Sequence, residues 1–112
     1  MKIKLTEKKC VPCEGGMPPM RLAEIKKYLP QLKNKWELSD SKKITYSFKF
    51  KTFKQAIVFV NRVAELAESE NHHPNIYILY NKVKIILTTH AIGGLSENDF
   101  ILAAKIENLF NL

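Results

Sequence analysis

The chain has 112 residues and a mass of 12.9 kDa, which is the size of one domain spanning residues 1–112. Hydrophobic residues make up 46% of it and charged residues 26%, which excludes disorder as the main state. No apolar run approaches the roughly 20 residues of a membrane helix, and the lysine-rich start lacks the apolar core of a signal peptide, so we expect a cytoplasmic protein.

Basic residues are concentrated in the first half of the chain. The net charge is +7: residues 1–56 carry 14 Lys/Arg against 5 Asp/Glu, whereas residues 57–112 carry 4 against 6. A basic half can contact nucleic acid or another anion, or it can be a solvated lysine-rich face. Because there is no tight run of Arg and the aromatics are not interleaved with the lysines, we favour the solvated face and expect no nucleic-acid partner.

The first 19 residues are predicted to form an irregular N-terminal arm. Three of the five prolines and two of the four glycines lie between positions 10 and 19. The same segment holds both cysteines, as Cys10-x-x-Cys13, which is half the ligand set of a zinc ribbon. Two interpretations stay open: a pair of inert thiols, or a structural metal shared between subunits.

A short helix and two strands are predicted next. Apolar residues at helical spacing predict a helix over residues 20–29, which Pro30 ends. Residues 36–38 are interpreted as a short strand and residues 39–41 as a turn. Residues 43–51 alternate between polar and apolar, as in a strand with one wet face. The apolar residues of this strand are Ile44, Tyr46, Phe48 and Phe50.

A long amphipathic helix is predicted over residues 52–69, with Thr52 as its capping residue. The apolar residues that follow the helical period are Phe53, Ala56, Ile57, Val60, Val63, Ala64 and Ala67. Phe53, Ile57, Val60 and Ala64 lie on one side, and one such face is expected to pack against the sheet. Phe59 and Leu66 lie off that stripe and form a second apolar patch, which needs another cover. We therefore predict a homo-oligomer, at least a dimer and plausibly a tetramer.

A hairpin and a last helix complete the predicted fold. Residues 76–80 and 83–89 are rich in β-branched and aromatic types and are joined by a two-residue polar link. A helix over residues 97–111 follows, because Ser96 and Asp99 fit the pattern of a helix start. The order α-β-β-α-β-β-α predicts an α+β fold, with a four-stranded, largely antiparallel sheet and three helices packed on one face.

The three histidines are the candidate chemical groups. If Tyr80 pairs with Val83, the ladder carried to its open end sets His73 opposite His90, with His72 adjacent. A proline next to His73 disturbs the ladder there, so we predict proximity rather than register. Imidazole exchanges protons near pH 7, and a cluster of three offers both an acid and a base. The alternative is that they are ordinary loop and edge residues.

Other chemistries are less well supported. Three histidines can hold Zn²⁺, but His72 and His73 are sequence neighbours, which point to opposite faces of an extended chain. We therefore expect no metal and no cofactor. Gly15-Gly16 and Gly93-Gly94 lack the further residues of a phosphate-binding loop. The sequence also has no serine nucleophile elbow of the kind that acyl transfer uses. A nucleotide-driven enzyme and a serine hydrolase are thus not indicated.

The chain resembles the pterin-4a-carbinolamine dehydratase family over nearly its whole length. The central segments that carry the resemblance are Glu68-Ser69-Glu70-Asn71-His72-His73-Pro74, Tyr80-Asn81-Lys82-Val83, Thr88-Thr89-His90, Gly93-Gly94-Leu95 and Asp99. Upstream matches are Trp36, Phe48-x-Phe50-x-x-Phe53 and Arg62-Val63-Ala64. The Cys10-x-x-Cys13 start is similar to that of many microbial members.

The resemblance implies a hydro-lyase that expels water from 4a-hydroxytetrahydropterin to give quinonoid dihydropterin, in tetrahydrobiopterin recycling. Such an enzyme needs an acid for the departing hydroxyl and a base for a ring N–H proton, and no metal or redox cofactor. Carried over by position, His72, His73 and His90 are the catalytic candidates. We expect His72 and His90 to transfer protons and His73 to orient the substrate.

Four further residues are substrate-binding candidates by the same resemblance. Glu68 precedes His72 by one helical turn and is expected to orient it or raise its pKa, unless it is a solvated charge. Trp36 is expected to wall the pterin pocket, with core packing as the equal alternative. Thr89 is expected to contact substrate, unless it packs as a strand-end residue. Asp99 matches the family's acid but also fits a helix start, which we favour.

The resemblance also implies partners. Similar members form dimers through sheet edges and tetramers through a helix bundle. Animal members also stabilise dimers of a homeodomain transcription factor, so a dimerisation or transcriptional cofactor, or another protein-binding module on the same fold, is the alternative function. Steep salt dependence would identify nucleic-acid binding by the basic half.

Overall fold

Four strands form one antiparallel sheet in the order β1-β2-β4-β3. The computed structural model describes residues 4–12 and 17–110. The strands are β1 (Glu37–Ser39), β2 (Lys43–Lys49), β3 (Asn75–Leu79) and β4 (Lys82–Leu87). The helices are α1 (Leu22–Tyr28), α2 (Phe53–Glu70) and α3 (Glu97–Phe110), with short 3-10 helices at Leu5–Glu7, Leu29–Gln31 and His90–Ile92.

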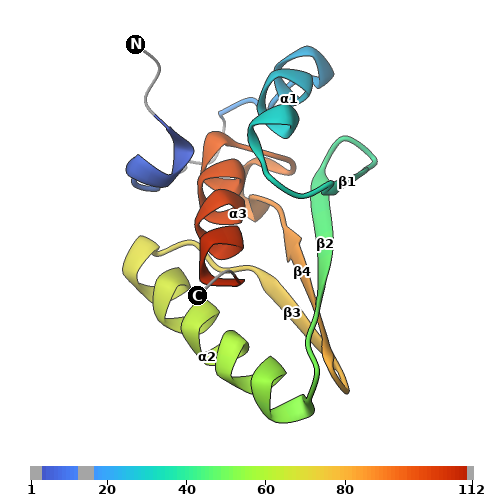
Figure 1. Cartoon of the computed structure of the whole chain (residues 1–112). Coiled ribbons are helices and arrows are strands. Elements are labelled where there is room, and N and C mark those ends of the chain that lie inside the picture. Colours follow the sequence, from blue (N-terminus) through green and yellow to red (C-terminus); the bar gives the residue numbers. More distant parts are fainter. Residues whose placement is uncertain (1–3, 13–16, 111–112) are drawn as a thin grey trace.

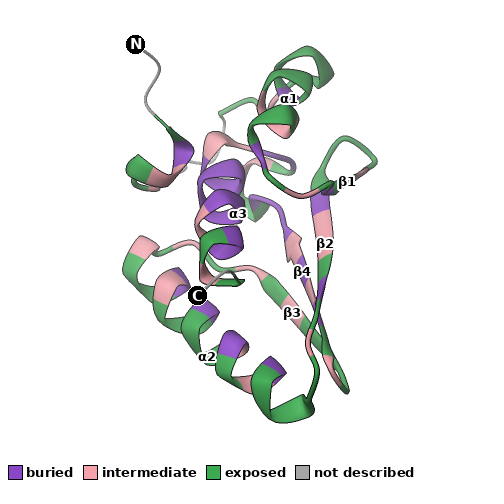
Figure 2. Ribbon diagram, viewed as in Figure 1, coloured by how far each residue is buried: buried purple, intermediate pink, exposed green. Residues whose placement is uncertain are grey.

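Helices α2 and α3 lie on the same side of the sheet, and α1 lies beyond them at the β1 end (Figure 1). The predicted α+β fold and its element order are confirmed. Alternation places every second residue of the central strands on the helix side. On this side Ile44 and Phe48 of β2 and Val83, Ile85 and Leu87 of β4 are buried, and Tyr46 is half-buried. Figure 2 shows the matching buried stripes on α2 and α3.

No helix among the described residues has both the length and the apolar character of a membrane span.

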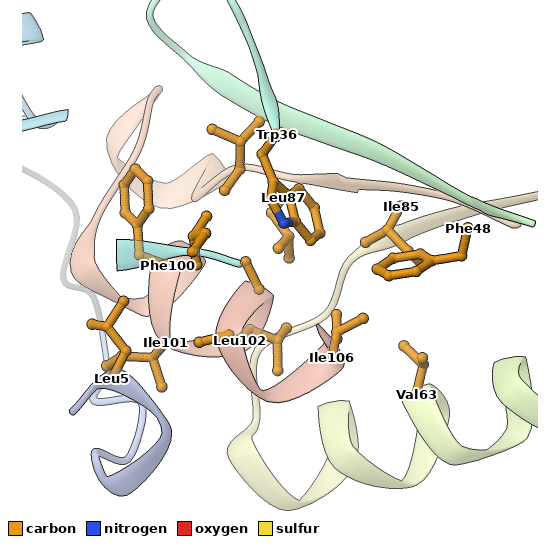
Figure 3. Close-up of a cluster of buried hydrophobic side chains, with 14 of the residues drawn as sticks. Leu5, Trp36, Phe48, Val63, Ile85, Leu87, Phe100, Ile101, Leu102 and Ile106 are labelled. Atoms are coloured by element: carbon orange, nitrogen blue, oxygen red, sulfur yellow. The ribbon is translucent and has the colours of Figure 1, made fainter. Parts of the chain in front are cut away.

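Helix α3 is the centre of the core. Its buried apolar residues include Phe100, Ile101, Leu102 and Ile106, each at most 1% exposed. Figure 3 shows Leu5, from the first 3-10 helix, beside Ile101, while Trp36 and Leu87 lie on the sheet side. Because α3 contacts both the N-terminal segment and the sheet, its first turn is well placed to organise distant parts of the chain.

Helix α2 buries part of the predicted apolar face together with one residue that was assigned to the outer patch. Its buried residues are Ala56, Val63 and Ala67, which were predicted to follow the apolar period, and Phe59, which was not. Phe59 is 3% exposed and Phe53 is 51% exposed, so the assignment of Phe59 to the outer patch and of Phe53 to the core was wrong. The reason is an aromatic cluster: the Phe59 ring lies 4.9 Å from that of Phe48 and 5.1 Å from that of Phe50.

The register of the β3–β4 hairpin also differs from the predicted one. Leu79 pairs with Lys82, so the turn residues are Tyr80 and Asn81 rather than Asn81 and Lys82. Tyr80 takes a left-handed conformation with φ 53°, and the Asn81 side chain donates to the Phe50 carbonyl at 2.8 Å, which fixes the turn. The pairing of Tyr80 with Val83, which would have set His73 opposite His90, is therefore not observed; the prediction itself was of proximity only.

Candidate functional site

All three histidines line one pocket of about 380 Å³. The remaining lining residues come from the arm, the α2–β3 junction, the end of β4 and the start of α3; they are Val11, Pro12, Asn71, Thr88, Thr89, Ala91 and Asn98. The predicted proximity of His72, His73 and His90 is confirmed, although the pairing used to derive it was not. Elements that are distant in sequence thus meet at one end of the sheet.

The end of α2 sets the direction of the two neighbouring histidines. Asn71 adopts a left-handed conformation with φ 51° and ψ 40°, which Asn tolerates better than most residues. The His72 N–H donates to the Ala67 carbonyl at 3.2 Å, closing the helix end. This reversal sends the two rings in different directions: the His72 side chain is 12% exposed and that of His73 is 56% exposed.

His72 is held by a buried carboxylate. Its Nε2 lies 2.7 Å from Oδ1 of Asp99, whose side chain is fully buried. The other oxygen, Oδ2, accepts the Thr89 hydroxyl at 2.8 Å and the Ser96 backbone N–H at 3.0 Å. A carboxylate only accepts hydrogen bonds, so His72 donates from Nε2, and in a neutral ring Nδ1 is then the acceptor.

Asp99 therefore has two roles in the geometry. The contact with the Ser96 N–H is the helix-start role that the sequence favoured. The contact with His72 adds a link to the pocket. Thr89 is 5% exposed, and its hydroxyl donates to the Asp99 carboxylate rather than to His72.

His73 has a carboxylate partner of its own. Its Nε2 lies 2.6 Å from Oε2 of Glu68, and both side chains are exposed. The expectation that Glu68 orients His72 was wrong, because the left-handed residue after α2 brings His73 rather than His72 to Glu68. Screening by water makes this pair weaker than the buried pair of His72.

His90 begins a tight loop at the end of β4. Thr89 and Gly94 form an isolated bridge, and Gly93 takes φ 68°, a value that favours glycine. A Cβ at position 94 would lie 2.6 Å from Cβ of Pro19, so glycine is required there by close packing. The loop places the exposed His90 ring at the pocket, where no described residue bonds to it.

Trp36 is not part of this site. It is 5% exposed, its Nε1 donates to Oε2 of Glu107 at 2.9 Å, and its ring packs against Tyr46 and Phe48. Glu107 also accepts the backbone N–H groups of Lys33 and Asn34. The expectation that Trp36 walls the pocket was wrong, and its core alternative is confirmed.

The arm residues of the pocket were missed by sequence reasoning. The Cys10 N–H donates to Glu70 at 2.8 Å, and Asn98 exchanges two hydrogen bonds with the backbone of Val11. Burial raises the pKa of Glu70, but its hydrogen bonds from Lys105 and the Cys10 N–H more than offset this and leave it below the ordinary value. No local pattern in a proline-rich arm indicates such contacts.

The Cys10 thiol is not activated in this structure. Burial and the neighbouring Glu70 carboxylate raise the pKa of Cys10 to about 12, so its thiol stays protonated at neutral pH. Cys13 lies outside the described residues. Within residues 4–12 and 17–110, His, Cys, Asp and Glu form no group of three that could hold a metal ion.

Comparison with known proteins shows the family of this chain. The family model described as pterin 4 alpha carbinolamine dehydratase matches residues 18–109. A relative from Nitrosomonas europaea, provisionally named a pterin-4-alpha-carbinolamine dehydratase, is 49% identical over 95% of this chain and 93% of its own. A relative of the same provisional name from Rickettsia canadensis is 48% identical over 93% of this chain and 95% of its own.

Solved structures show the same fold. The transcriptional coactivator/pterin dehydratase from Brucella melitensis superposes with a TM-score of 0.76 at 35% identity, covering 81% of this chain and 97% of that one. A pterin dehydratase-like protein, identified as a RuBisCO assembly factor in the alpha-carboxysome, has a TM-score of 0.60 at 24% identity over 70% of this chain and 92% of that one, and shares the fold alone. The histidine pocket, the matched segment and the relatives converge, and the chain belongs to the pterin-4a-carbinolamine dehydratase family.

Proposed function

We propose that this protein dehydrates 4a-hydroxytetrahydropterin to quinonoid dihydropterin by histidine acid–base catalysis, in tetrahydrobiopterin recycling. The observation that carries the proposal is the single pocket lined by His72, His73 and His90, in which two of the rings have carboxylate partners. Family membership supports a pterin substrate, and the three imidazole rings of the pocket are groups of the kind that can transfer the two protons.

The reaction is a balanced elimination. The bond between C4a and the hydroxyl oxygen breaks, and the oxygen leaves as water after taking a proton from an acid. A base removes the proton of a ring nitrogen, whose electron pair forms the new C=N bond. No electrons enter or leave the system, so one group that gives a proton and one that takes a proton are sufficient.

His72 is suited to be the base. Asp99 accepts its Nε2–H, which leaves Nδ1 to take the ring proton. The imidazolium that forms then lies 2.7 Å from a buried negative charge, which stabilises it. A buried carboxylate also fixes the ring orientation, since its other oxygen is bound to Thr89 and Ser96.

His90 is then the acid for the departing hydroxyl, and His73 orients the substrate. His90 is exposed at the loop that follows β4, so its ring can exchange protons with water between turnovers. The ring of His73 is hydrogen-bonded to the exposed Glu68. This contact favours a role in binding a polar atom of the substrate over a role in proton transfer.

The direct test is the decay of freshly generated 4a-hydroxytetrahydropterin in the presence of the purified protein and a chelator. Acceleration well above buffer, unaffected by EDTA, is the expected result. Decay at the buffer rate would refute the proposal. Acceleration that EDTA abolishes would refute the metal-free mechanism.

We also propose that the protein is a homo-oligomer, a dimer or a tetramer. Strand β3 is an edge of the sheet, and three of its large hydrophobic residues, Tyr77, Ile78 and Leu79, are exposed. On α2, Phe53 and Val58 are exposed as well. Edge pairing with a second copy would satisfy the backbone of β3, and packing of α2 helices would cover the apolar side chains.

A further inference from the structure

The arm segment Cys10–Pro12 is fixed against the start of α3 by specific hydrogen bonds. The Val11 N–H donates to Oδ1 of Asn98 at 3.0 Å, and Nδ2 of Asn98 donates to the Val11 carbonyl at 2.5 Å. One amide side chain thus pairs with both backbone groups of Val11. The Cys10 N–H adds a bond to Glu70 at 2.8 Å, and Glu70 is itself bound by Lys105.

This fixation presents an apolar side chain at the pocket. Val11 is 64% exposed although its backbone is held in place, and both Val11 and Pro12 line the pocket of the three histidines. Ligand sites commonly combine apolar walls with a few polar groups that orient the ligand. A flat heterocycle bound at the histidines would remove this apolar surface from water.

The arm and the proposed base share one anchor. Asn98 holds Val11, and the next residue, Asp99, holds His72. Asn98 is 4% exposed and Asp99 is fully buried. The first turn of α3 therefore fixes the distance between the apolar wall and the proton-transfer group.

We propose that Val11 and Pro12 form a substrate-contacting wall that sets the affinity for the pterin, and that Asn98 is the residue that positions this wall. The inference rests on the proposed dehydratase function and names a specificity determinant for it. Contact with a non-reacting part of the substrate is made equally in the ground state and the transition state. It therefore changes KM and leaves kcat unchanged.

The test is steady-state kinetics of Val11→Ala, with Met17→Ala as the matched control. Met17 is an exposed apolar residue of the same arm, 52% exposed, and it does not line the pocket. Loss of two methyl groups from a partly covered wall is expected to raise KM about three- to tenfold. The kcat of Val11→Ala, and both constants of Met17→Ala, are expected to stay at the wild-type values.

The role of Asn98 is tested by a double-mutant cycle. Asn98→Ala is expected to raise KM in the wild-type background but to have little further effect in Val11→Ala, because both changes remove the same contact. Independent, multiplying effects would overturn the positioning role. Unchanged KM in Val11→Ala would overturn the wall and leave the dehydratase proposal standing.

Equilibrium binding separates failure of the wall from failure of the proposed function. If the wild-type protein does not accelerate dehydration, titration with fluorescent 7,8-dihydrobiopterin still measures pterin binding. Weaker binding by Val11→Ala, with unchanged binding by Met17→Ala, would support the wall alone. Absence of dihydrobiopterin binding by the inactive wild-type protein would overturn both.

Discussion

Asp99 and His72 are 27 positions apart in the sequence and are joined by a 2.7 Å hydrogen bond between a fully buried carboxylate oxygen and the ring Nε2. The carboxylate lies in the first turn of α3, and the ring follows α2. This bond fixes the tautomer of the proposed base. It also depends on the docking of α3, so fold and site are coupled at this point.

The replacement Asp99→Asn tests that bond. We expect kcat to fall about 10²- to 10³-fold, because a neutral amide neither fixes the tautomer nor stabilises the imidazolium. Glu68→Gln is the matched change at His73, and it should cost less than about tenfold, because that pair is exposed. Steady-state kinetics measures both. Equal losses in the two variants would contradict the unequal roles of the two histidines.

The sequence predicted β2 from its alternation and the last helix from the helix-start pattern at Ser96 and Asp99. For α2 it predicted most of the buried residues but not Phe59. The apolar arc of this helix is broad, so periodicity alone did not show which edge of the arc is buried. Phe59 is buried because its ring packs against the ring of Phe48 in β2 and that of Phe50 just after β2.

The candidate site shows the same limit. The hairpin was sufficient to bring the histidines together, but the carboxylate partners depended on one left-handed residue, Asn71. Trp36 was misplaced because its hydrogen-bond partner, Glu107, is 71 positions away. No sequence pattern placed Val11 at the pocket, because its position depends on a hydrogen bond between its backbone N–H and the Asn98 side chain.

The loop that carries His90 should be sensitive to Gly94→Ala. A Cβ at this position would lie 2.6 Å from Cβ of Pro19, closer than a Cβ atom comes to a non-bonded carbon in proteins. We expect a loss of about 1–3 kcal/mol in the free energy of unfolding, measured by urea denaturation. Gly93→Asn is the control, since it meets no atom within 4 Å and Asn tolerates positive φ. A Gly94→Ala variant as stable as Gly93→Asn would contradict the packing.

The anchor of the arm at Glu70 should give a characteristic acid dependence of stability. The pKa of Glu70 is lowered from the ordinary value of 4.5, so its contribution is fully present above pH 4.5 and is lost as pH falls through the lower folded value. The difference in free energy of unfolding between wild type and Glu70→Gln should therefore shrink on acidification. The exposed Glu65→Gln is the control. A difference that is constant or grows toward acid would contradict the pKa direction.

The oligomer is tested by two phenylalanines of α2. Phe53→Glu places a charge on an exposed apolar residue, and we expect a smaller assembly of folded protein. Phe59→Glu places a charge in the core, and we expect loss of the fold. Light scattering coupled to size exclusion, together with circular dichroism, distinguishes these results. A single wild-type peak near 12.9 kDa would refute the oligomer.

The most direct measurement of histidine catalysis is the single-turnover rate of dehydration by His72→Ala and His90→Ala, each compared with the wild-type protein under the same conditions. If the two rings are the base and the acid, each replacement should slow the step by about 10²- to 10⁴-fold. Circular dichroism should remain unchanged, since His90 is exposed and His72 lies at the pocket. Folded variants that dehydrate the substrate at the wild-type rate would contradict histidine acid–base catalysis in this pocket.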